Sequence, residues 1–417
     1  MSSLLSKRGD FRRVLIVAVS MYLIMVVNGA LLLLVVGLKE IAQEFGWPRS
    51  APSLAYAFLF MGSGIGGIVM GYWYDRSGVG PVTCLGAVMI GLGAILSSMV
   101  SSQWQLYVIY GVMMGFLGQA TMFGPLVINV MTWFEHRKGF AVGLITAGQG
   151  VAGALWPPMF RHFNETASWQ QTFFWFGVFA LLTAAPLTLV LWHLKRAKVV
   201  QAAANRVGAK DSMSRIGAND LDWSPWLIQS VLCVAILGCC VSMSMPLAHL
   251  VAHATDLGHP SARAAEMLSI ALVAATIVRL VGGSSLVDRF GGLIALLIFS
   301  STQALGLALY AVVDGLVALY VVSVLFGLGY GGINMCYPVL VRRYLPAGQS
   351  GRRLGVVLLF GALGMAIGGW IAGYVFDVTG TYMPAFLLGL GFNVMNLIII
   401  GIMISQSYRP RPQPALA

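Results

Sequence analysis

The chain has 417 residues, of which 58% are hydrophobic and only 9% are charged, and its mean hydropathy is +0.84. A water-soluble domain carries about 25% charged residues, so this composition excludes an ordinary soluble enzyme. The net charge of +11 does not indicate nucleic-acid binding, because the basic residues collect in the breaks between apolar segments and so predict membrane topology.

Long apolar segments recur along the chain with short polar breaks, and each is long enough to cross a bilayer, which takes about 20 residues. The first segment is too long for the core of a signal peptide and is expected to stay as a membrane span. We predict spans near 13–38, 52–74, 80–100, 104–130, 139–160, 170–193, 225–254, 263–287, 292–312, 315–341, 353–376 and 382–405.

The predicted fold class is therefore an all-α membrane protein with twelve transmembrane helices in two pseudo-symmetric six-helix halves. The expected parts are an N-terminal bundle (1–193), a cytoplasmic linker (194–224), a C-terminal bundle (225–405) and a cytoplasmic tail (406–417). Most of the 25 basic residues lie in one set of breaks, which includes the linker and both ends of the chain. The positive-inside rule then places both termini in the cytoplasm of a multi-pass protein of the cell membrane.

The two halves repeat one another in sequence. Gly71-Tyr-Trp-Tyr-Asp-Arg-Ser-Gly78 follows the second span, and Ser284-Ser-Leu-Val-Asp-Arg-Phe-Gly291 follows the eighth. Gly115-Phe-Leu-Gly118 and Gly329-Tyr-Gly-Gly332 correspond at nearly the same separation. This pattern indicates parallel six-helix repeats, related by an axis along the membrane normal, with a substrate cavity between them.

Arg279 is the one basic residue inside an apolar span core. At ~1.5 Å per residue it lies about 13 Å from Asp288, at the end of its span, and so near the middle of the bilayer. A charge there is costly and should face a protein-lined or wet cavity and pair with an anion. Acidic residues are predicted only in loops, tails and helix ends, so the expected anion is a ligand carboxylate, which fits the planar guanidinium fork. Two alternatives stay open: the side chain snorkels to the cytoplasmic headgroups, or it bonds helix carbonyls.

Other polar side chains at mid-depth are candidates to orient a small acid by hydrogen bonds. Tyr330 and Asn334 lie one turn apart on the glycine-rich tenth span, so both are able to face one cavity. Each polar candidate is equally a candidate for an interhelical hydrogen bond worth about 0.6 kcal/mol. Besides Arg279, the candidate substrate-binding residues are Asn28, Gln119, Gln149, Tyr330, Asn334 and, as an apolar wall, Phe360. The alternative for Phe360 is aromatic packing between helices.

His249 is the proton-coupling candidate, because histidine alone has an unperturbed pKa in the physiological range. It lies in the seventh span, about 14 Å above Arg279 along the membrane normal. Direct contact between the two would need a bend in the helix or a solute between them. The alternative is a histidine of the outer vestibule that is hydrogen-bonded to backbone.

Four stretches of the chain resemble a known transporter family: Gly37-Leu-Lys-Glu-Ile-Ala-Gln-Glu-Phe45, Trp133-Phe-Glu-His-Arg-Lys-Gly-Phe-Ala-Val-Gly143, His249-Leu-Val-Ala-His-Ala-Thr-Asp-Leu-Gly258 and the span of Arg279. With the repeated Asp-Arg loop, they resemble the major facilitator superfamily of secondary transporters, in its monocarboxylate transporter and oxalate/formate exchanger branch. The resemblance implies a structural and gating role for Asp75, Arg76, Asp288 and Arg289, which would fasten helix ends rather than bind substrate.

The chain departs from these relatives at three charged positions. Ala275 stands where animal monocarboxylate transporters carry an aspartate one turn before the arginine, and Leu32 stands near the place of their first-helix lysine. The helix-eleven lysine of oxalate exchangers has no counterpart after Arg353. One buried cation suits one carboxylate better than two, so a monocarboxylate is expected.

The sequence thus predicts a secondary active transporter of a small monocarboxylate such as lactate or pyruvate, with proton symport by alternating access. The expected partners are the acid anion, the proton and the bilayer, with no nucleic acid, no obligate protein partner and no cofactor or metal. An anion exchanger without proton flux is the first alternative, and a membrane receptor or sensor for organic acids is the second. An enzyme is not expected, since the spans hold neither a paired acid and base nor a phosphate-binding loop.

Overall fold

The computed structural model describes residues 2–134, 138–193, 221, 223–346 and 350–407, and within these ranges it is helical without strands. The linker at 194–220 and 222 and the tail beyond 407 lie outside the described residues, as do the side chains of Asp288 and Asn334. The boundaries 1–193, 194–224, 225–405 and 406–417 therefore remain predictions.

The N-terminal half has six predicted spans, and its fourth is built from three consecutive helical segments. Its elements are α1 (Ser2–Phe45), α2 (Ser50–Ser77), α3 (Val79–Ser97), α4 (Gln103–Val108), η1 (Ile109–Gln119), α5 (Ala120–Trp133), α6 (Lys138–Thr166) and α7 (Trp169–His193). The segment η1 is a π-helix, so the fourth span is widened over these residues.

The C-terminal half repeats this plan, with its eighth span interrupted by a short π-helix. Its elements are α9 (Pro225–Asp256), α10 (Ser261–Ile277), η2 (Val278–Gly282), α11 (Gly283–Phe290), α12 (Gly292–Tyr310), α13 (Leu316–Tyr344), α14 (Ser350–Thr379) and α15 (Met383–Ser407). Within the described residues, 11 helices are long and apolar enough to cross a membrane. The predicted span that is not among them is α6, which has 29 residues.

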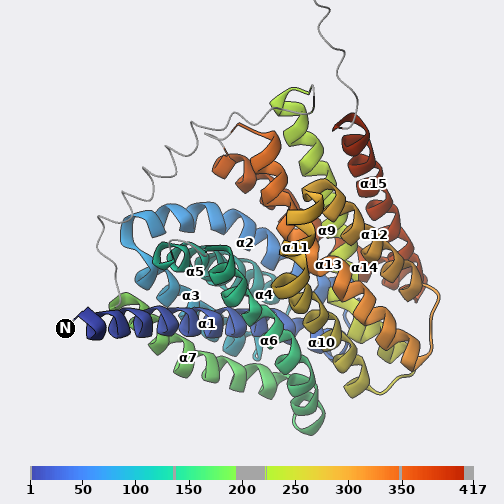
Figure 1. Ribbon diagram of the computed structural model, residues 1–417. Helices are drawn as coiled ribbons and strands as arrows, with labels where there is room; N and C mark the ends of the chain where they lie inside the picture. The colour runs from blue at the N-terminus through green and yellow to red at the C-terminus, as the bar shows by residue number, and fades with distance from the viewer. Residues whose placement is uncertain (1, 135–137, 194–220, 222, 347–349, 408–417) are drawn as a thin grey trace, which may run out of the picture.

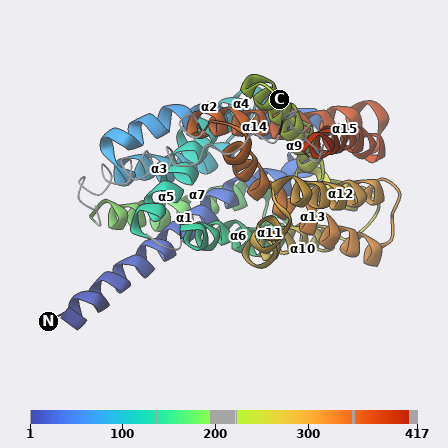
Figure 2. The same cartoon turned by 45° about the horizontal axis from the view of Figure 1, so that its top comes forward.

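The helices form two groups, α1 to α7 and α9 to α15, which lie side by side in Figures 1 and 2. The groups contact each other mainly through α2 with α14, α6 with α10 and α1 with α9. The first two contacts pair the second span with the eleventh and the fifth with the eighth, as a twofold repeat requires. The twelve-helix architecture of two halves is confirmed.

Glycines show at which end the two halves meet. An added Cβ at Gly369 would lie 2.5 Å from the Tyr56 ring, and one at Gly373 would lie 2.4 Å from Ser53 Oγ, so α14 and α2 touch at the predicted outer end. At the predicted cytoplasmic end, Gly67 and Gly71 of α2 have nothing within 4 Å. The halves are therefore closed against each other at the predicted outer end, whereas Gly67 and Gly71 make no such contact toward the other end.

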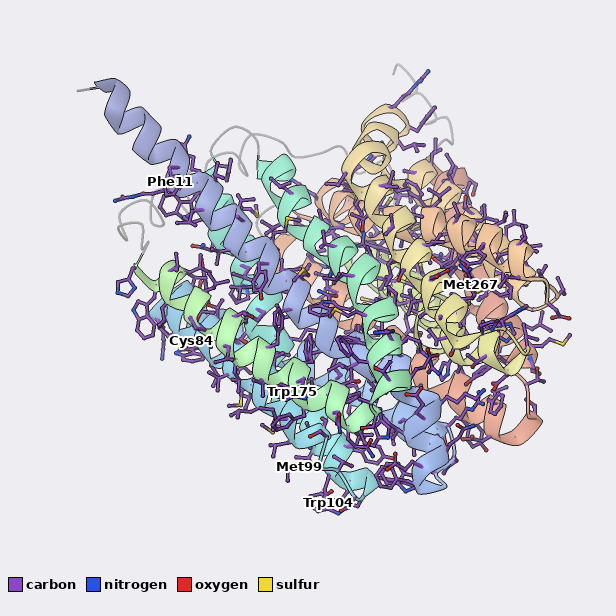
Figure 3. The ribbon with its side chains drawn as sticks, turned by 90° about the horizontal axis from the view of Figure 1, so that it is seen from below. Phe11, Cys84, Met99, Trp104, Trp175 and Met267 are labelled. Carbon is purple, nitrogen blue, oxygen red and sulfur yellow. The ribbon has the colours of Figure 1, made fainter. Side chains whose placement is uncertain are left out.

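Large apolar side chains cover the outside of the bundle, as expected where the solvent is lipid. Met99, Trp104 and Trp175 are 74%, 65% and 64% exposed and lie on the surface in Figure 3. The first turns of α1, which include Phe11, project beyond the bundle in the same view.

Candidate functional site

Arg279 lies in η2, the π-helical turn that interrupts the eighth span. Short π-helical segments occur often at functional sites, because the extra residue per turn redirects the side chains. The other π-helix, η1, ends at Gln119. Gln119, at the end of one described π-helix, and Arg279, inside the other, both line a cavity between the halves.

This central cavity has a volume of about 280 Å³. Arg279 is the one charged residue among its described lining residues, and the polar groups around it are two glutamines, an asparagine, a threonine and a tyrosine. The lining residues are Asn28, Leu31, Leu32, Phe60, Gln119, Gln149, Ile236, Cys240, Met243, Leu247, Leu272, Thr276, Arg279, Tyr330, Leu358, Gly361, Ala362 and Met365.

The Arg279 guanidinium is held by neutral groups on both sides of the cavity. Its Nη1 donates a hydrogen bond to Gln149 Oε1 at 2.6 Å, and its Nε donates to the Gly331 carbonyl at 3.3 Å. Its Cζ lies 5.5 Å from the centroid of the Tyr330 ring, within range of a cation–π contact. The described residues form no ion pair with Arg279. Because the guanidinium is bonded to Gln149 and Gly331 at the wall of the cavity, the snorkelling alternative is wrong, and the bond to a helix carbonyl is present.

The structure brings together most of the polar side chains that the sequence singled out. Asn28, Gln119, Gln149 and Tyr330 all line the cavity with Arg279, although Asn28 also donates to the Ile24 carbonyl of its own helix at 2.8 Å. The side chain of Asn334 is not among those that the structure describes, so its role stays a prediction.

One predicted lining residue needs correction. Phe360 does not line the cavity, because the face that α14 turns to it holds Leu358, Gly361, Ala362 and Met365 at helical spacing, and Phe360 lies off that face. The aromatic wall is Phe60 of α2 instead.

His249 is fully buried away from the cavity, at the contact between α9, α14 and the start of α15. Its Nε2 donates to the Gly369 carbonyl at 2.7 Å, and in a neutral ring its Nδ1 then accepts from the Tyr382 hydroxyl at 3.1 Å. It is therefore a backbone-bonded histidine beside the outer contact between the halves. The backbone hydrogen bond is the one that the alternative anticipated, but the side chain is fully buried and does not face a vestibule.

Sequence reasoning missed Thr276 and Phe60 as lining residues, since neither differs in type from the many threonines and phenylalanines elsewhere in the spans. Leu32, which stands near the position of a lysine in related transporters, lines the cavity as an apolar group. The cavity therefore offers one fixed positive charge among its described residues.

The predicted outer end is closed by charged groups that join the two halves. Asp256 at the end of α9 accepts from Lys39 Nζ at 2.8 Å and from both terminal nitrogens of Arg49, with Nη2 at 2.8 Å. The Arg49 guanidinium also lies 3.7 Å from the centroid of the Phe376 ring and donates to Tyr382 Oη at 3.0 Å. We call Lys39, Arg49 and Asp256 the outer lock.

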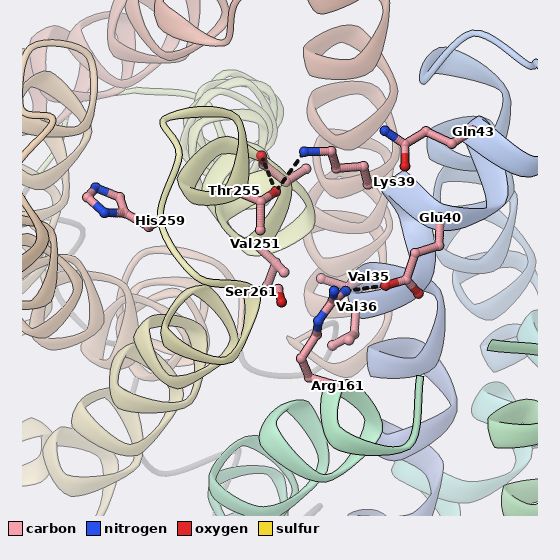
Figure 4. Close-up of a pocket in the computed structure, with 11 residues that line it drawn as sticks. Val35, Val36, Lys39, Glu40, Gln43, Arg161, Val251, Thr255, His259 and Ser261 are labelled. Atoms are coloured by element: carbon pink, nitrogen blue, oxygen red, sulfur yellow. Dashed lines mark hydrogen bonds and ion pairs between the residues drawn. The ribbon is translucent and has the colours of Figure 1, made fainter. Parts of the chain in front are cut away.

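Two further bonds cross the interface at the same end. Asp377 at the end of α14 accepts from the backbone N–H groups of Arg49 at 2.7 Å and Ser50 at 2.8 Å, and so satisfies free donors at the start of α2. A second cavity of about 260 Å³ lies beside the outer lock (Figure 4). Its walls carry the Lys39–Thr255 hydrogen bond and the Glu40–Arg161 ion pair.

Three of the four Asp-Arg loop residues are described at the opposite end, and no described contact links them to the other half. Asp75, Arg76 and Arg289 are exposed, and Arg76 donates to the Tyr72 hydroxyl of its own helix. The side chain of Asp288 is not described, so its role stays a prediction.

A family model described as the Major Facilitator Superfamily matches residues 14–369 and, in a second overlapping match, residues 230–417. Among curated proteins, Monocarboxylate transporter 13 of Rattus norvegicus is 27% identical over 369 residues, which cover 86% of this chain and 79% of that protein. Monocarboxylate transporter 11 of Homo sapiens is 28% identical and covers 83% of this chain and 72% of its own.

Solved structures agree on the fold. A POT family transporter in complex with 5-aminolevulinic acid aligns with a TM-score of 0.72 over 95% of this chain and 96% of its own, at 13% identity. A mutant of the nucleoside transporter NupG aligns with a TM-score of 0.71 over 94% of this chain and 99% of its own, also at 13% identity. The chain therefore belongs to the Major Facilitator Superfamily and is a membrane transporter.

Proposed function

We propose that the chain is a secondary active transporter that moves a small monocarboxylate, and that Arg279 binds the carboxylate. The observation that carries this proposal is a guanidinium in the central cavity whose described partners are neutral. Removing a charge from water costs several kcal/mol unless a counter-charge and hydrogen bonds replace the lost solvation. A carboxylate supplies both, because its two oxygens match the guanidinium fork.

The size and charge of the cavity support a small monoanion. Its volume of about 280 Å³ is just below the usual range for small-molecule pockets, roughly 300–1,000 Å³. Among the described lining residues Arg279 is the single cation, and Leu32 and the neighbouring leucines offer nothing to a second carboxylate. A dicarboxylate would leave one of its two charges without a counter-cation among the described lining residues, which is costly.

Alternating access is the mechanism that the helix contacts support. The cavity lies between the halves, the outer lock ties them together at one end, and the glycines Gly67 and Gly71 face open space at the other. Under the predicted topology, this is a state open toward the cytoplasm. Breaking the outer lock while the other end closes would expose Arg279 to the opposite side.

We propose proton symport as the coupling mode, because a proton that accompanies the anion cancels its charge. Without it, inward movement of one negative charge costs about 2.3 kcal/mol per 100 mV of inside-negative potential. Electroneutral exchange of two carboxylates is the second candidate. It is favoured by the described lining residues, which contain no aspartate, glutamate or histidine to take the proton, and by the burial of His249 outside the cavity.

The test is uptake by the purified protein in proteoliposomes that contain a pH-sensitive dye. We expect saturable uptake of lactate or pyruvate, little uptake of oxalate or succinate, and none of the uncharged lactamide. Arg279→Ala should abolish uptake, and Arg279→Lys should leave a small fraction because an ammonium lacks the planar fork. Arg263→Ala is the matched control, since Arg263 is an exposed residue of the same span that pairs with Glu266 three positions later.

Normal uptake by Arg279→Ala would refute the proposal. Acidification of the lumen during uptake without internal substrate supports symport, whereas uptake that requires internal carboxylate and leaves the lumen pH unchanged supports exchange.

A further inference from the structure

The hydrogen bond between Arg279 and Gln149 joins the two halves where they pack together beside the cavity. Arg279 belongs to η2 of the C-terminal half, and Gln149 belongs to α6 of the N-terminal half. The backbones beside the pair are in close contact: an added Cβ at Gly150 would lie 2.1 Å from Thr276 Oγ1, and one at Gly153 would lie 2.3 Å from Leu272 Cβ. Packing between α6 and α10 therefore fixes where the amide and the guanidinium meet.

The chemistry of the pair leaves unused donors. A guanidinium only donates, so the Gln149 oxygen must face it, and the two N–H groups of the amide have no hydrogen-bond partner among the described residues. Arg279 in turn uses Nε and Nη1, and its Nη2 has no described hydrogen-bond partner. A carboxylate that binds the fork through two nitrogens competes with Gln149 Oε1 for Nη1.

We propose that Gln149 takes the place of the substrate in the empty carrier and binds the substrate in the loaded one. Without ligand, its amide oxygen satisfies Arg279. When a carboxylate occupies the guanidinium, the amide turns about its terminal side-chain bond and donates an N–H to a carboxylate oxygen. The anion is then held by both halves at once, which links its binding to the relative position of α6 and α10. This inference rests on the proposed role of Arg279.

Two substitutions separate this role from a purely structural one. Gln149→Glu puts a carboxylate of the chain itself where the substrate carboxylate would bind. We expect the thermal midpoint of the substrate-free protein to rise, and the further rise on adding lactate or pyruvate to vanish. Gln149→Met keeps the approximate size of the side chain but removes both donor and acceptor. We expect its KM for the carboxylate to rise about tenfold, the equivalent of one charge-assisted hydrogen bond, with a smaller change in maximal rate.

Gln171→Glu, at an exposed position near the start of α7, is the matched control and should behave like the unsubstituted protein. A ligand-induced thermal shift that persists in Gln149→Glu, or an unchanged KM in Gln149→Met, would overturn the role of Gln149. Uptake by Arg279→Ala reports on the proposed function independently. If that variant is inactive while the Gln149 variants behave normally, only the present inference fails.

Discussion

The outer lock allows a quantitative prediction from one substitution, Asp256→Asn. The carboxylate of Asp256 holds Lys39 and Arg49 of the other half, and asparagine keeps the shape of the side chain while it removes the charge. Loss of the lock should favour the conformation in which the predicted outer end is open. The affinity for the carboxylate at Arg279, deeper in the molecule, should change much less than this conformational equilibrium.

The magnitude follows from the exposure of the ion pairs. Two unit charges about 4 Å apart attract by roughly 4 kcal/mol at an effective dielectric constant of about 20, before any solvation cost. The side chains of Lys39 and Asp256 are 27% and 25% exposed and that of Arg49 is 12% exposed, so solvent screening and lost hydration offset most of this. We take about 1 kcal/mol for each pair. The sum of about 2 kcal/mol shifts the equilibrium between closed and open outer ends by roughly 30-fold.

The assay is an electron-spin distance measurement across the predicted outer end. Spin labels at Gln171 of the N-terminal half and Val312 of the C-terminal half occupy exposed positions, and Cys84, the one described cysteine that is not buried, is replaced by serine. The distance distribution should move toward longer separations in Asp256→Asn. A Thr255→Val variant, which removes only the neutral hydroxyl bonded to Lys39, should move it far less.

A distribution that is unchanged in Asp256→Asn would refute this reasoning. It would mean that the glycine-lined contact of α14 with α2 closes the outer end without help from the ion pairs.

Further substitutions test other parts of the account. Asp377→Asn should weaken the cap on the start of α2, lower the thermal midpoint and lengthen the same spin-label distance, because a cap is worth about 1 kcal/mol. Gly150→Val should push α6 away from Thr276, so it should lower uptake and reduce the free energy of unfolding by about 1–3 kcal/mol through overpacking. Gly67→Ala is the control: Gly67 has open space around it, so this variant should unfold at an unchanged temperature. His249→Phe should break the bonds to Tyr382 and the Gly369 carbonyl and weaken outer closure without changing carboxylate affinity, a combination that distance and binding measurements would reveal.

The fold was predictable because the signals that define it are long and repeated. Twelve apolar segments of membrane-spanning length, and an Asp-Arg loop repeated after the second and eighth spans, need no tertiary information to interpret. Arg279 was predictable for a related reason: a charge in an apolar span has few physical explanations, and it therefore identifies the side of its helix that faces the cavity.

The details of the cavity were harder to predict because most of these helices are apolar on all sides. A helix without a polar face does not reveal its rotation from sequence, since lipid and protein interior select the same residue types. Phe360 was therefore assigned to the wrong face of α14, and Phe60 was missed. The polar candidates Gln119, Gln149 and Tyr330 carried more information, because a mid-membrane hydrogen-bonding group has few places to point.

The contacts between halves were also beyond the sequence. Lys39, Arg49 and Asp256 lie at helix ends, where charged residues are common in any membrane protein, and Asp256 is far along the chain from the other two. They come together only because α1 packs against α9 and α2 begins beside the end of α9. The same holds for His249, whose neighbours Tyr382 and Gly369 come from the last two spans.

The most direct test of the central claim is calorimetric binding of pyruvate and of its uncharged amide to the purified protein and to Arg279→Ala. The account predicts that the unsubstituted protein binds the acid and discriminates against the amide, and that Arg279→Ala loses affinity for the acid by about 100-fold, as expected for a charge-assisted pair worth close to 3 kcal/mol. Equal dissociation constants for the acid in the two proteins, or equal affinity of the unsubstituted protein for the acid and the amide, would contradict it.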